Sequence, residues 1–331
     1  MHSTPDLILV TRPIPEAGLR LIRESCQVRV WEERQPLPRD VLLREIADCD
    51  GLICLLSDRI DAEVIAAGRR LRAISQYAVG LDNIDLAAAT ARGIVVGHTP
   101  GVLTEATADL AFALLMAAAR RLPEGIENVR AGEWLAWEPL GFLGVDVWGA
   151  TLGLIGVGRI GTAVARRGRG FAMRVLYHGP RRKPELEAEL GLEYAALDDL
   201  LAQSDFVSLH CPLTEATRHL IDERALRRMK RTAVLVNTAR GQVVVTEALE
   251  RALREGWIAA AALDVTDPEP LPPDHPLLEL PNCLVVPHIG SATVRTRERM
   301  AVMVAENLLA GLRGERPPYC ANPQLFEGRQ A

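Results

Sequence analysis

Short apolar runs alternate with segments of helical spacing along most of the chain. In the first hundred residues the runs predict strands at 7–11, 28–31, 51–55, 73–77 and 94–96. The segments between them, such as 38–48 and 62–67, have the spacing of helices. The alternation returns later, with strands predicted at 173–177, 206–210, 233–237, 258–263 and 283–287. This order of elements predicts an α/β fold in which parallel sheets carry helices on both faces.

Two segments differ from this alternation. Residues 104–121 form a strongly apolar stretch, which predicts a buried helix closed by Arg120 and Arg121 before Pro123. Residues 124–149 then carry three of the five tryptophans among glycines and prolines, and we expect an irregular segment there. We favour an arm that contacts a second subunit, with local packing as the alternative. A last helix is predicted at 292–312.

The stretch T-L-G-L-I-G-V-G-R-I-G at residues 151–161 is a short strand that breaks into glycines before a helical pattern at 159–170. Gly156, Gly158 and Gly161 have the G-x-G-x-x-G spacing of dinucleotide sites. The first glycine permits the turn, the second lets the backbone approach a pyrophosphate, and the third lets helix and strand pack closely. The phosphates would bind N–H groups at the positive end of the helix.

The loop after the next strand bears on the choice of cofactor. An NAD-preferring site would have an acidic residue there for the ribose hydroxyls, but this chain has His178 and Gly179, then Pro180-Arg181-Arg182-Lys183. A guanidinium can bind a 2′-phosphate through two parallel hydrogen bonds, whereas a carboxylate would repel it. We therefore favour NADP(H) over NAD(H), the alternative being a solvated loop that is basic by chance.

Composition narrows the class of protein. The 331 residues suit two domains, and 48% hydrophobic residues with a net charge of −5 are ordinary for a soluble enzyme without nucleic-acid or membrane partners. No leader or membrane-spanning stretch is visible, so we expect a cytoplasmic protein. The six cysteines show neither paired spacing nor clustering with histidines, so we expect reduced thiols and no metal site.

Three residues that follow predicted strands could supply chemistry. Arg240, Glu269 and His288 are separated by about one βα unit each, so they can meet at the carboxyl edge of neighbouring strands. A nicotinamide-dependent enzyme must hold its substrate and supply a proton to the oxygen that becomes a hydroxyl. Arginine suits the first task through its planar fork, and histidine suits the second because it titrates near neutral pH. A carboxylate such as Glu269 beside the histidine would favour the imidazolium.

Each of these residues also has a plain structural interpretation. A histidine after a strand is often only a structural residue, Arg240 could be a surface charge, and Glu269 lies in a proline-rich turn. In the first hundred residues, the turn with Val79 and Gly80 could receive a substrate carboxylate on free N–H groups, or could be an ordinary turn before a helix.

Several motifs along the chain together match those of one known family. Through G-V-G-R-I-G, N-T-A-R-G, A-L-D-V-T-D-P-E-P-L and P-H-I-G-S-A-T the chain resembles the D-isomer-specific 2-hydroxyacid dehydrogenases along nearly its whole length. Within that family it looks most like the glyoxylate/hydroxypyruvate reductases. The resemblance implies two doubly wound, Rossmann-like domains, with a dinucleotide-binding domain at 101–289 inserted into a flavodoxin-like substrate domain at 1–100 and 290–331. It also implies a homodimer with an arm at 123–149.

The resemblance further implies roles for single residues. Arg240 would bind the substrate carboxylate together with Val79, Gly80 and His288, and His288 would be the acid/base with Glu269 as its partner. The implied cofactor-binding residues are Thr107, Gly156, Gly158, Arg159, Ile160, Gly161, Arg181, Arg182, Cys211, Pro212, Thr217, Thr238, Ala239, Asp264, His288 and Gly290. The implied activity is reduction of glyoxylate and hydroxypyruvate to glycolate and D-glycerate. Phosphonate (phosphite) dehydrogenase or D-lactate-type activity, and a non-catalytic NAD(H)-sensing protein, are the alternatives.

Overall fold

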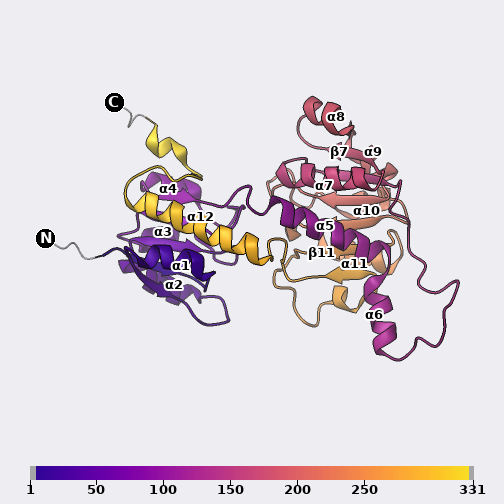
Figure 1. Ribbon diagram of the computed structural model, residues 1–331, viewed down its shortest axis with the longest axis horizontal. Helices are drawn as coiled ribbons and strands as arrows, with labels where there is room; N and C mark the ends of the chain where they lie inside the picture. Colours follow the sequence, from indigo (N-terminus) through magenta and orange to yellow (C-terminus); the bar gives the residue numbers. More distant parts are fainter. Residues whose placement is uncertain (1–4, 328–331) are drawn as a thin grey trace. The chain divides into compact units, whose positions relative to one another are not determined.

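The computed structural model of the protein describes residues 5–327, and the chain divides into two compact units (Figure 1). Unit 1 is Met1–Leu103 with Ser291–Ala331, and unit 2 is Thr104–Gly290. The outermost residues, 1–4 and 328–331, lie outside the described part of the chain. The second unit is therefore an insertion between two stretches that fold together.

Unit 1 is a five-stranded parallel sheet with the strand order β2-β1-β3-β4-β5. Its strands are β1 (Leu7–Val10), β2 (Gln27–Val30), β3 (Gly51–Cys54), β4 (Ala73–Gln76) and β5 (Val95–Gly97). Its helices are α1 (Glu16–Arg23), α2 (Arg39–Glu45), α3 (Ala62–Ala67), α4 (Leu86–Ala91) and α12 (Val294–Leu312), with short 3₁₀ turns at Ile46–Asp48 and Pro323–Phe326.

Unit 2 is a seven-stranded parallel sheet with the order β12-β11-β10-β9-β6-β7-β8. Its strands are β6 (Thr151–Ile155), β7 (Arg174–His178), β8 (Glu193–Tyr194), β9 (Phe206–Leu209), β10 (Val234–Asn237), β11 (Ala260–Leu263) and β12 (Cys283–Val285). Its helices are α5 (Thr104–Ala119), α6 (Leu122–Arg130), α7 (Arg159–Gly170), α8 (Pro184–Leu190), α9 (Leu197–Gln203), α10 (Glu223–Arg228) and α11 (Thr246–Arg254), with 3₁₀ turns at Gly241–Val243 and Pro276–Glu279.

Alternate side chains of each strand enter different cores, because successive residues of a strand point to opposite faces. In β1, Ile8 and Val10 pack with α1 and α12, whereas Leu9 packs with α2 and α3. In unit 2 one core holds α5 and α7, and the other holds α9, α10 and α11. Both units therefore have helices on both faces of a parallel sheet, which confirms the predicted fold class.

Side-chain caps explain where several helices begin. The Asp61 carboxylate accepts the Val64 N–H at the start of α3, and Asp222 accepts from Ala225 at the start of α10. The Thr293 hydroxyl accepts from Thr296 at the start of α12. Each contact satisfies one of the amides that a first helical turn leaves without a partner.

The segment after α5 differs from its predicted form. Helix α5 ends at Ala119, and Arg121 has a left-handed backbone with φ of 51°. A second helix, α6, then covers Leu122–Arg130, so the first part of the expected irregular segment is helical. Proline is accepted in a first helical turn, where its missing N–H is not needed, and Pro123 therefore starts a helix here. Residues 131–150 are irregular, as expected.

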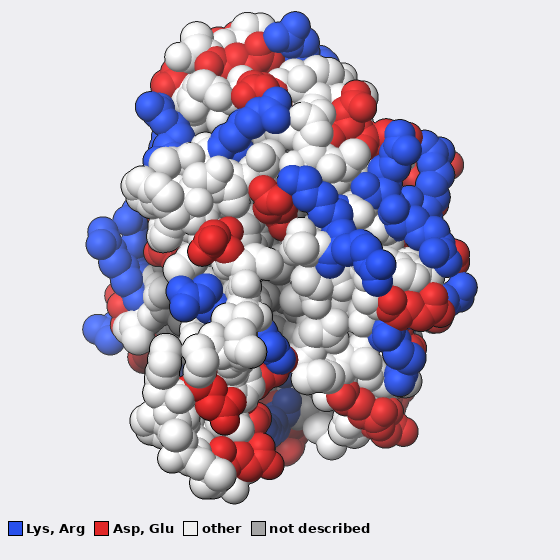
Figure 2. Space-filling model, turned by 90° about the vertical axis from the view of Figure 1, so that its right-hand side faces the viewer, with Lys and Arg blue, Asp and Glu red and all other residues white. Residues whose placement is uncertain are grey.

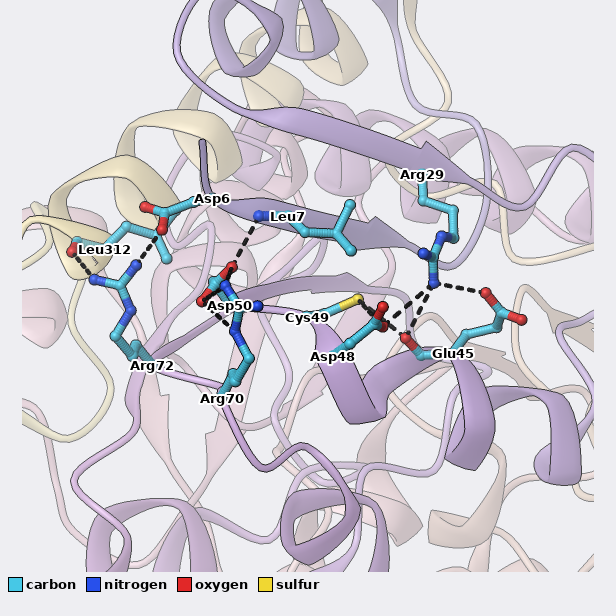
Figure 3. Close-up of polar contacts among 10 residues, drawn as sticks. All are labelled: Asp6, Leu7, Arg29, Glu45, Asp48, Cys49, Asp50, Arg70, Arg72 and Leu312. Atoms are coloured by element: carbon cyan, nitrogen blue, oxygen red, sulfur yellow. Dashed lines mark hydrogen bonds and ion pairs between the residues drawn. The ribbon is translucent and has the colours of Figure 1, made fainter. Parts of the chain in front are cut away.

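Ion pairs cluster at the amino edge of the unit 1 sheet (Figure 3). Asp50, which precedes β3, accepts from Arg70 at 2.9 Å and from the Leu7 N–H at 2.9 Å. Arg72, which precedes β4, pairs with Asp6 and donates to the Leu312 carbonyl at 2.7 Å. These contacts tie the starts of three strands to the end of α12.

The molecule's charges are interspersed on the face shown in Figure 2, with uncharged stretches between them.

Among the described residues, no helix combines the length and apolar character needed to cross a bilayer. No disulfide is present either, and Cys26, Cys49, Cys54, Cys211, Cys283 and Cys320 are free thiols.

Candidate active site

The glycine turn between β6 and α7 has the geometry that a dinucleotide site requires. Gly156 has φ of +94°, and a Cβ there would lie 2.8 Å from the Cys211 nitrogen. A Cβ on Gly161 would lie 2.1 Å from the Gly156 carbonyl oxygen, so strand and helix approach too closely for a side chain. A Cβ on Gly158 would meet nothing within 4 Å, and no side chain caps the helix there. The open side of the turn thus presents the N–H groups of Arg159 and Ile160, which no side chain caps.

Two buried polar atoms at the carboxyl ends of the neighbouring strands β9 and β10 lack a partner in the described part of the chain. They are Thr238 Oγ1, after β10, and His210 Nδ1, after β9. Burial without a partner is costly for polar atoms, so such atoms often mark a place where a ligand or water completes the contacts. Together with the glycine turn, they fit a bound nucleotide.

The loop after β7 carries the expected basic side chains, but one of them already has a partner within the protein. Arg181 is exposed, whereas Arg182 pairs with Glu187 at 2.5 Å and lies over the Tyr194 ring. That pairing lowers the pKa of the Glu187 carboxyl, because the guanidinium stabilises its charged form. No carboxylate occupies the turn that directly follows β7, and His178, the last residue of that strand, is hydrogen-bonded to the Ala195 carbonyl.

The ends of β9 and β10 hold further residues of the expected nucleotide site. Thr217 donates to the Pro212 carbonyl at 2.6 Å, which closes the loop after Cys211. Burial raises the pKa of the Cys211 thiol to about 11, so it is an uncharged packing group. Ala239 N–H donates to Asn237 at 3.0 Å, which shapes the turn beside Thr238.

His288 and Glu269 are in direct contact. His288 Nδ1 lies 2.6 Å from Glu269 Oε1, and both side chains are partly exposed. A carboxylate oxygen accepts hydrogen bonds, so Nδ1 carries the hydrogen and Nε2 is left facing the other way. His288 also has a left-handed backbone, with φ of 52°. Strained backbone of this kind is found at functional sites that the surroundings hold in place.

Asp264 clamps the loop that carries His288. Its two carboxylate oxygens accept the Ile289 N–H at 2.6 Å and the Gly290 N–H at 2.9 Å, and its carbonyl accepts the His288 N–H at 2.9 Å. Thr107 donates to the Gly290 carbonyl at 3.1 Å on the other side. Burial raises the pKa of the Asp264 carboxyl, although these N–H groups oppose that shift. The sequence predicted a cofactor contact for Asp264 but not its hydrogen bonds to the loop that carries His288.

Arg240 follows β10, beside the strand that ends at Asp264. Its Nη1 donates to the Ala239 carbonyl at 2.8 Å, and its own carbonyl accepts from Asn237 at 2.9 Å. A Cβ on Gly241 would lie 1.9 Å from the Thr266 carbonyl, so the two loops are packed backbone to backbone. The structure thus brings Arg240, Asp264 and His288 to the carboxyl ends of three adjacent strands.

In unit 1, Val79 and Gly80 form a half-buried turn after β4. Below it, fully buried Gln76 donates to Asn83 Oδ1 at 2.7 Å. Asn83 donates in turn to the Leu55 carbonyl at 3.0 Å and the Asp58 carbonyl at 2.8 Å. Gln76 and Asn83 were not among the expected site residues, because a buried neutral amide has no signal in a single sequence.

The comparisons with known proteins agree with this geometry. Residues 112–290 match the family described as D-isomer specific 2-hydroxyacid dehydrogenase, NAD binding domain. The chain belongs to this family of oxidoreductases, and unit 2 contains its nicotinamide-nucleotide-binding domain. This confirms the predicted family and the predicted enzyme class.

Particular relatives cover nearly the whole chain. A glyoxylate reductase of Korarchaeum cryptofilum is 57% identical, over 97% of this chain and 97% of its own length. A crystal structure of a Thermus thermophilus protein has a TM-score of 0.90 with 52% identity, covering 95% of this chain and 99% of that one. An NADPH-dependent glyoxylate/hydroxypyruvate reductase of Sinorhizobium meliloti, in complex with NADP and malonate, has a TM-score of 0.85 with 32% identity, over 96% and 97% of the two chains.

Proposed function

We propose that the protein reduces glyoxylate to glycolate and hydroxypyruvate to D-glycerate. The observation that carries this proposal is the contact of His288 with Glu269 on a loop clamped by Asp264. The names of relatives more than half identical to this chain support glyoxylate as the substrate.

His288 would supply the proton. With Glu269 accepting from Nδ1, the Nε2–H is free to donate to the carbonyl oxygen of the substrate, which becomes the hydroxyl of the product. By accepting from Nδ1, the carboxylate fixes which ring nitrogen faces the substrate. A bound nicotinamide nucleotide supplies the hydride that reduces the carbonyl carbon.

Arg240 and the turn after β4 would bind the substrate. The Arg240 guanidinium can grip a carboxylate with two parallel hydrogen bonds. The Val79 and Gly80 N–H groups are neutral donors, and in the described residues neither has a hydrogen bond. Such amides suit a carboxylate oxygen, because they bind charge without adding a second cation.

The nucleotide would bind on the glycine turn and the strand ends of unit 2. Gly156, Gly158 and Gly161 would admit the pyrophosphate, and Thr238 with Ala239 would lie at the nicotinamide ribose. We propose a preference for NADP(H), supported by the exposed Arg181 and by the absence of a carboxylate directly after β7. Arg182 can contact a 2′-phosphate only if its guanidinium also keeps, or gives up, its ion pair with Glu187.

We further propose a cytoplasmic homodimer. Ten of the fourteen large apolar side chains that are well exposed in the described chain lie between Leu122 and Trp148, including Trp137 at 82% exposure. Apolar side chains concentrated on one projecting segment are typical of an interface. Six free thiols suit a reducing compartment.

The test is loss of reduced-nicotinamide absorbance with glyoxylate and with hydroxypyruvate, each with NADPH and with NADH. We expect turnover of both acids, faster with NADPH. Faster turnover with NADH would keep the reductase and remove the role of Arg181. Turnover of neither acid would contradict the proposal, and phosphite oxidation or pyruvate reduction would then identify the alternative activities.

A further inference from the structure

The turn after β4 is held by its carbonyl oxygens. Thr99 N–H donates to the Ala78 carbonyl at 2.9 Å, and His98 Nδ1 lies 2.9 Å from the Val79 carbonyl oxygen. Both donors come from the end of β5, the strand next to β4. Two consecutive peptide groups of the turn are therefore fixed from the same neighbouring strand.

Fixing a carbonyl also fixes the amide of the same peptide group. A trans peptide is planar, and its C=O and N–H point in opposite directions. When Ala78 O accepts from Thr99, the Val79 N–H points away from that donor. When Val79 O accepts from His98, the Gly80 N–H does the same. Gln76 adds a longer contact of 3.4 Å to the Gly80 carbonyl, so the next amide is held only loosely.

The His98 contact does not depend on the protonation state of the ring. A carbonyl oxygen can only accept, so Nδ1 must carry the hydrogen. That hydrogen is present both in the neutral Nδ1–H tautomer and in the imidazolium. His98 therefore acts as a fixed donor, whereas His288 has to exchange a proton.

The backbone of His98 is anchored independently of its ring. Its carbonyl accepts from Asn307 Nδ2 at 2.9 Å, and its N–H donates to the Tyr319 carbonyl at 3.1 Å. Asn307 Oδ1 accepts the Tyr319 N–H at 3.0 Å, which joins α12 to the segment that follows it. Removing the ring should consequently release the Val79 carbonyl without displacing the end of β5.

We propose that His98 is a positioning residue for substrate binding, which aims the Gly80 N–H at the substrate carboxylate by holding the Val79 carbonyl. This inference rests on the proposed function, in which the turn receives that carboxylate. His98 touches the turn and not the reacting atoms. Its effect belongs in the KM for the keto acid, because the carboxylate is bound alike before and during the reaction.

The test compares three substitutions at residue 98. His98→Ala removes the donor, and His98→Leu removes it while keeping bulk. His98→Asn places an amide nitrogen where Nδ1 lies in histidine. We expect Ala and Leu to raise the KM for glyoxylate about tenfold, the effect of one hydrogen bond of about 1.4 kcal/mol, with kcat and the Kd for NADPH within about twofold of wild type. Asn should restore KM to within about threefold.

Trp31→Phe is the matched control, because it removes another ring N–H that donates to a carbonyl in unit 1. Trp31 Nε1 donates to the Gln35 carbonyl at 3.0 Å, after the edge strand β2. It should leave KM unchanged. A KM for His98→Leu equal to that of wild type, an Asn variant as impaired as Leu, or an equal loss of NADPH affinity would overturn the inference. If wild-type protein reduced no glyoxylate, the proposed function itself would fail, and the inference with it.

Discussion

The two units differ in the groups that they present at the carboxyl edges of their parallel sheets. In unit 2, that edge carries Arg240, Asp264 and His288, which are charged or titratable and lie at the ends of adjacent strands. In unit 1, the turn after β4 at that edge carries backbone amides whose peptide carbonyls accept from Thr99 and His98. The carboxylate after β3, Asp58, is buried and accepts from the Thr11 hydroxyl and the Leu55 N–H, and the ion pairs of Asp50 and Arg72 lie at the amino edge (Figure 3). The same fold thus presents charged and titratable side chains at one edge and directed backbone amides at the other.

The two edges differ because a side chain that transfers a proton and an amide that binds a carboxylate need different support. A group that transfers a proton needs a partner such as Glu269 to fix its hydrogen, and burial or charge to tune it. A neutral amide needs only a fixed direction, which a hydrogen bond to the carbonyl of its peptide group supplies. Substitutions of the charged residues at the strand ends of unit 2 should therefore have larger effects than the tenfold change expected at His98.

The largest effect is expected for Arg240→Ala. It removes a bidentate, charge-assisted contact, and we expect kcat/KM for glyoxylate to fall about a thousandfold, with both KM and kcat affected. Steady-state kinetics measures this directly. Arg231→Ala, which removes an exposed arginine that precedes β10, should leave both constants unchanged. A loss at Arg240 no larger than that at His98 would break the contrast between the two edges.

A smaller loss is expected for Glu269→Gln. The amide keeps the shape of the carboxylate but not its charge, so the Nδ1–H of His288 loses its charged acceptor. We expect kcat to fall on the order of 100-fold while the Kd for NADPH is unchanged. Glu279→Gln is the control for an exposed carboxylate of the same unit. Full activity of Glu269→Gln would remove the pair from the mechanism.

The free energy of unfolding should depend on pH through His210. Burial lowers the pKa of His210 from 6.5 to about 4. The unfolded chain therefore binds a proton more readily than the folded one below pH 6.5, and stability is lost as the pH falls from about 6.5 to about 4. The shift corresponds to at most about 3 kcal/mol.

Urea unfolding at a series of pH values, in wild type and in His210→Asn, measures this contribution. The variant should lose less stability over that range. His219→Asn is the control, because His219 is exposed and its left-handed backbone suits asparagine. Parallel pH profiles for wild type and His210→Asn would contradict a neutral buried His210.

The smallest effect is expected in the basic loop after β7. Replacing Arg181 and Arg182 together with Ala should raise the KM for NADPH about tenfold and leave the KM for NADH nearly unchanged. Arg181→Ala alone should account for most of the change, because Arg182 pairs with Glu187. Equal effects on the two cofactors would show that the loop does not contact a 2′-phosphate.

Sequence reasoning predicted the parts that depend on local pattern. Apolar runs placed every strand except β8 to within one or two residues, and glycine spacing placed the turn before α7, because both follow from period and backbone sterics. The two-residue strand β8 was missed, since it is too short to show a pattern. Helix α6 was missed, since Pro123 indicated a break rather than a first turn. Arg240, Glu269 and His288 stood out because their spacing of about one βα unit can bring them to one sheet edge, and because an arginine, a carboxylate and a histidine suit hydride-transfer chemistry.

The contacts that support those residues could not be predicted. The clamp of Asp264 on Ile289 and Gly290, and the donor His98 for Val79, join residues from different strand ends. Only the fold brings them together, and a neutral hydrogen bond has no sequence signal of its own. The supporting contacts are therefore visible only in the structure, whereas the candidate catalytic residues could be proposed from the sequence.

The central claim is that His288, held by Glu269 and Asp264 of the same unit, delivers the proton to the substrate. It is tested most directly by single-turnover reduction of glyoxylate with NADPH already bound, in wild type and in His288→Ala. We predict complete oxidation of the bound NADPH by wild type, and a rate lower by about 100-fold or more in the variant with unchanged NADPH affinity. Equal rates in the two proteins, or loss of NADPH binding in the variant, would contradict the claim.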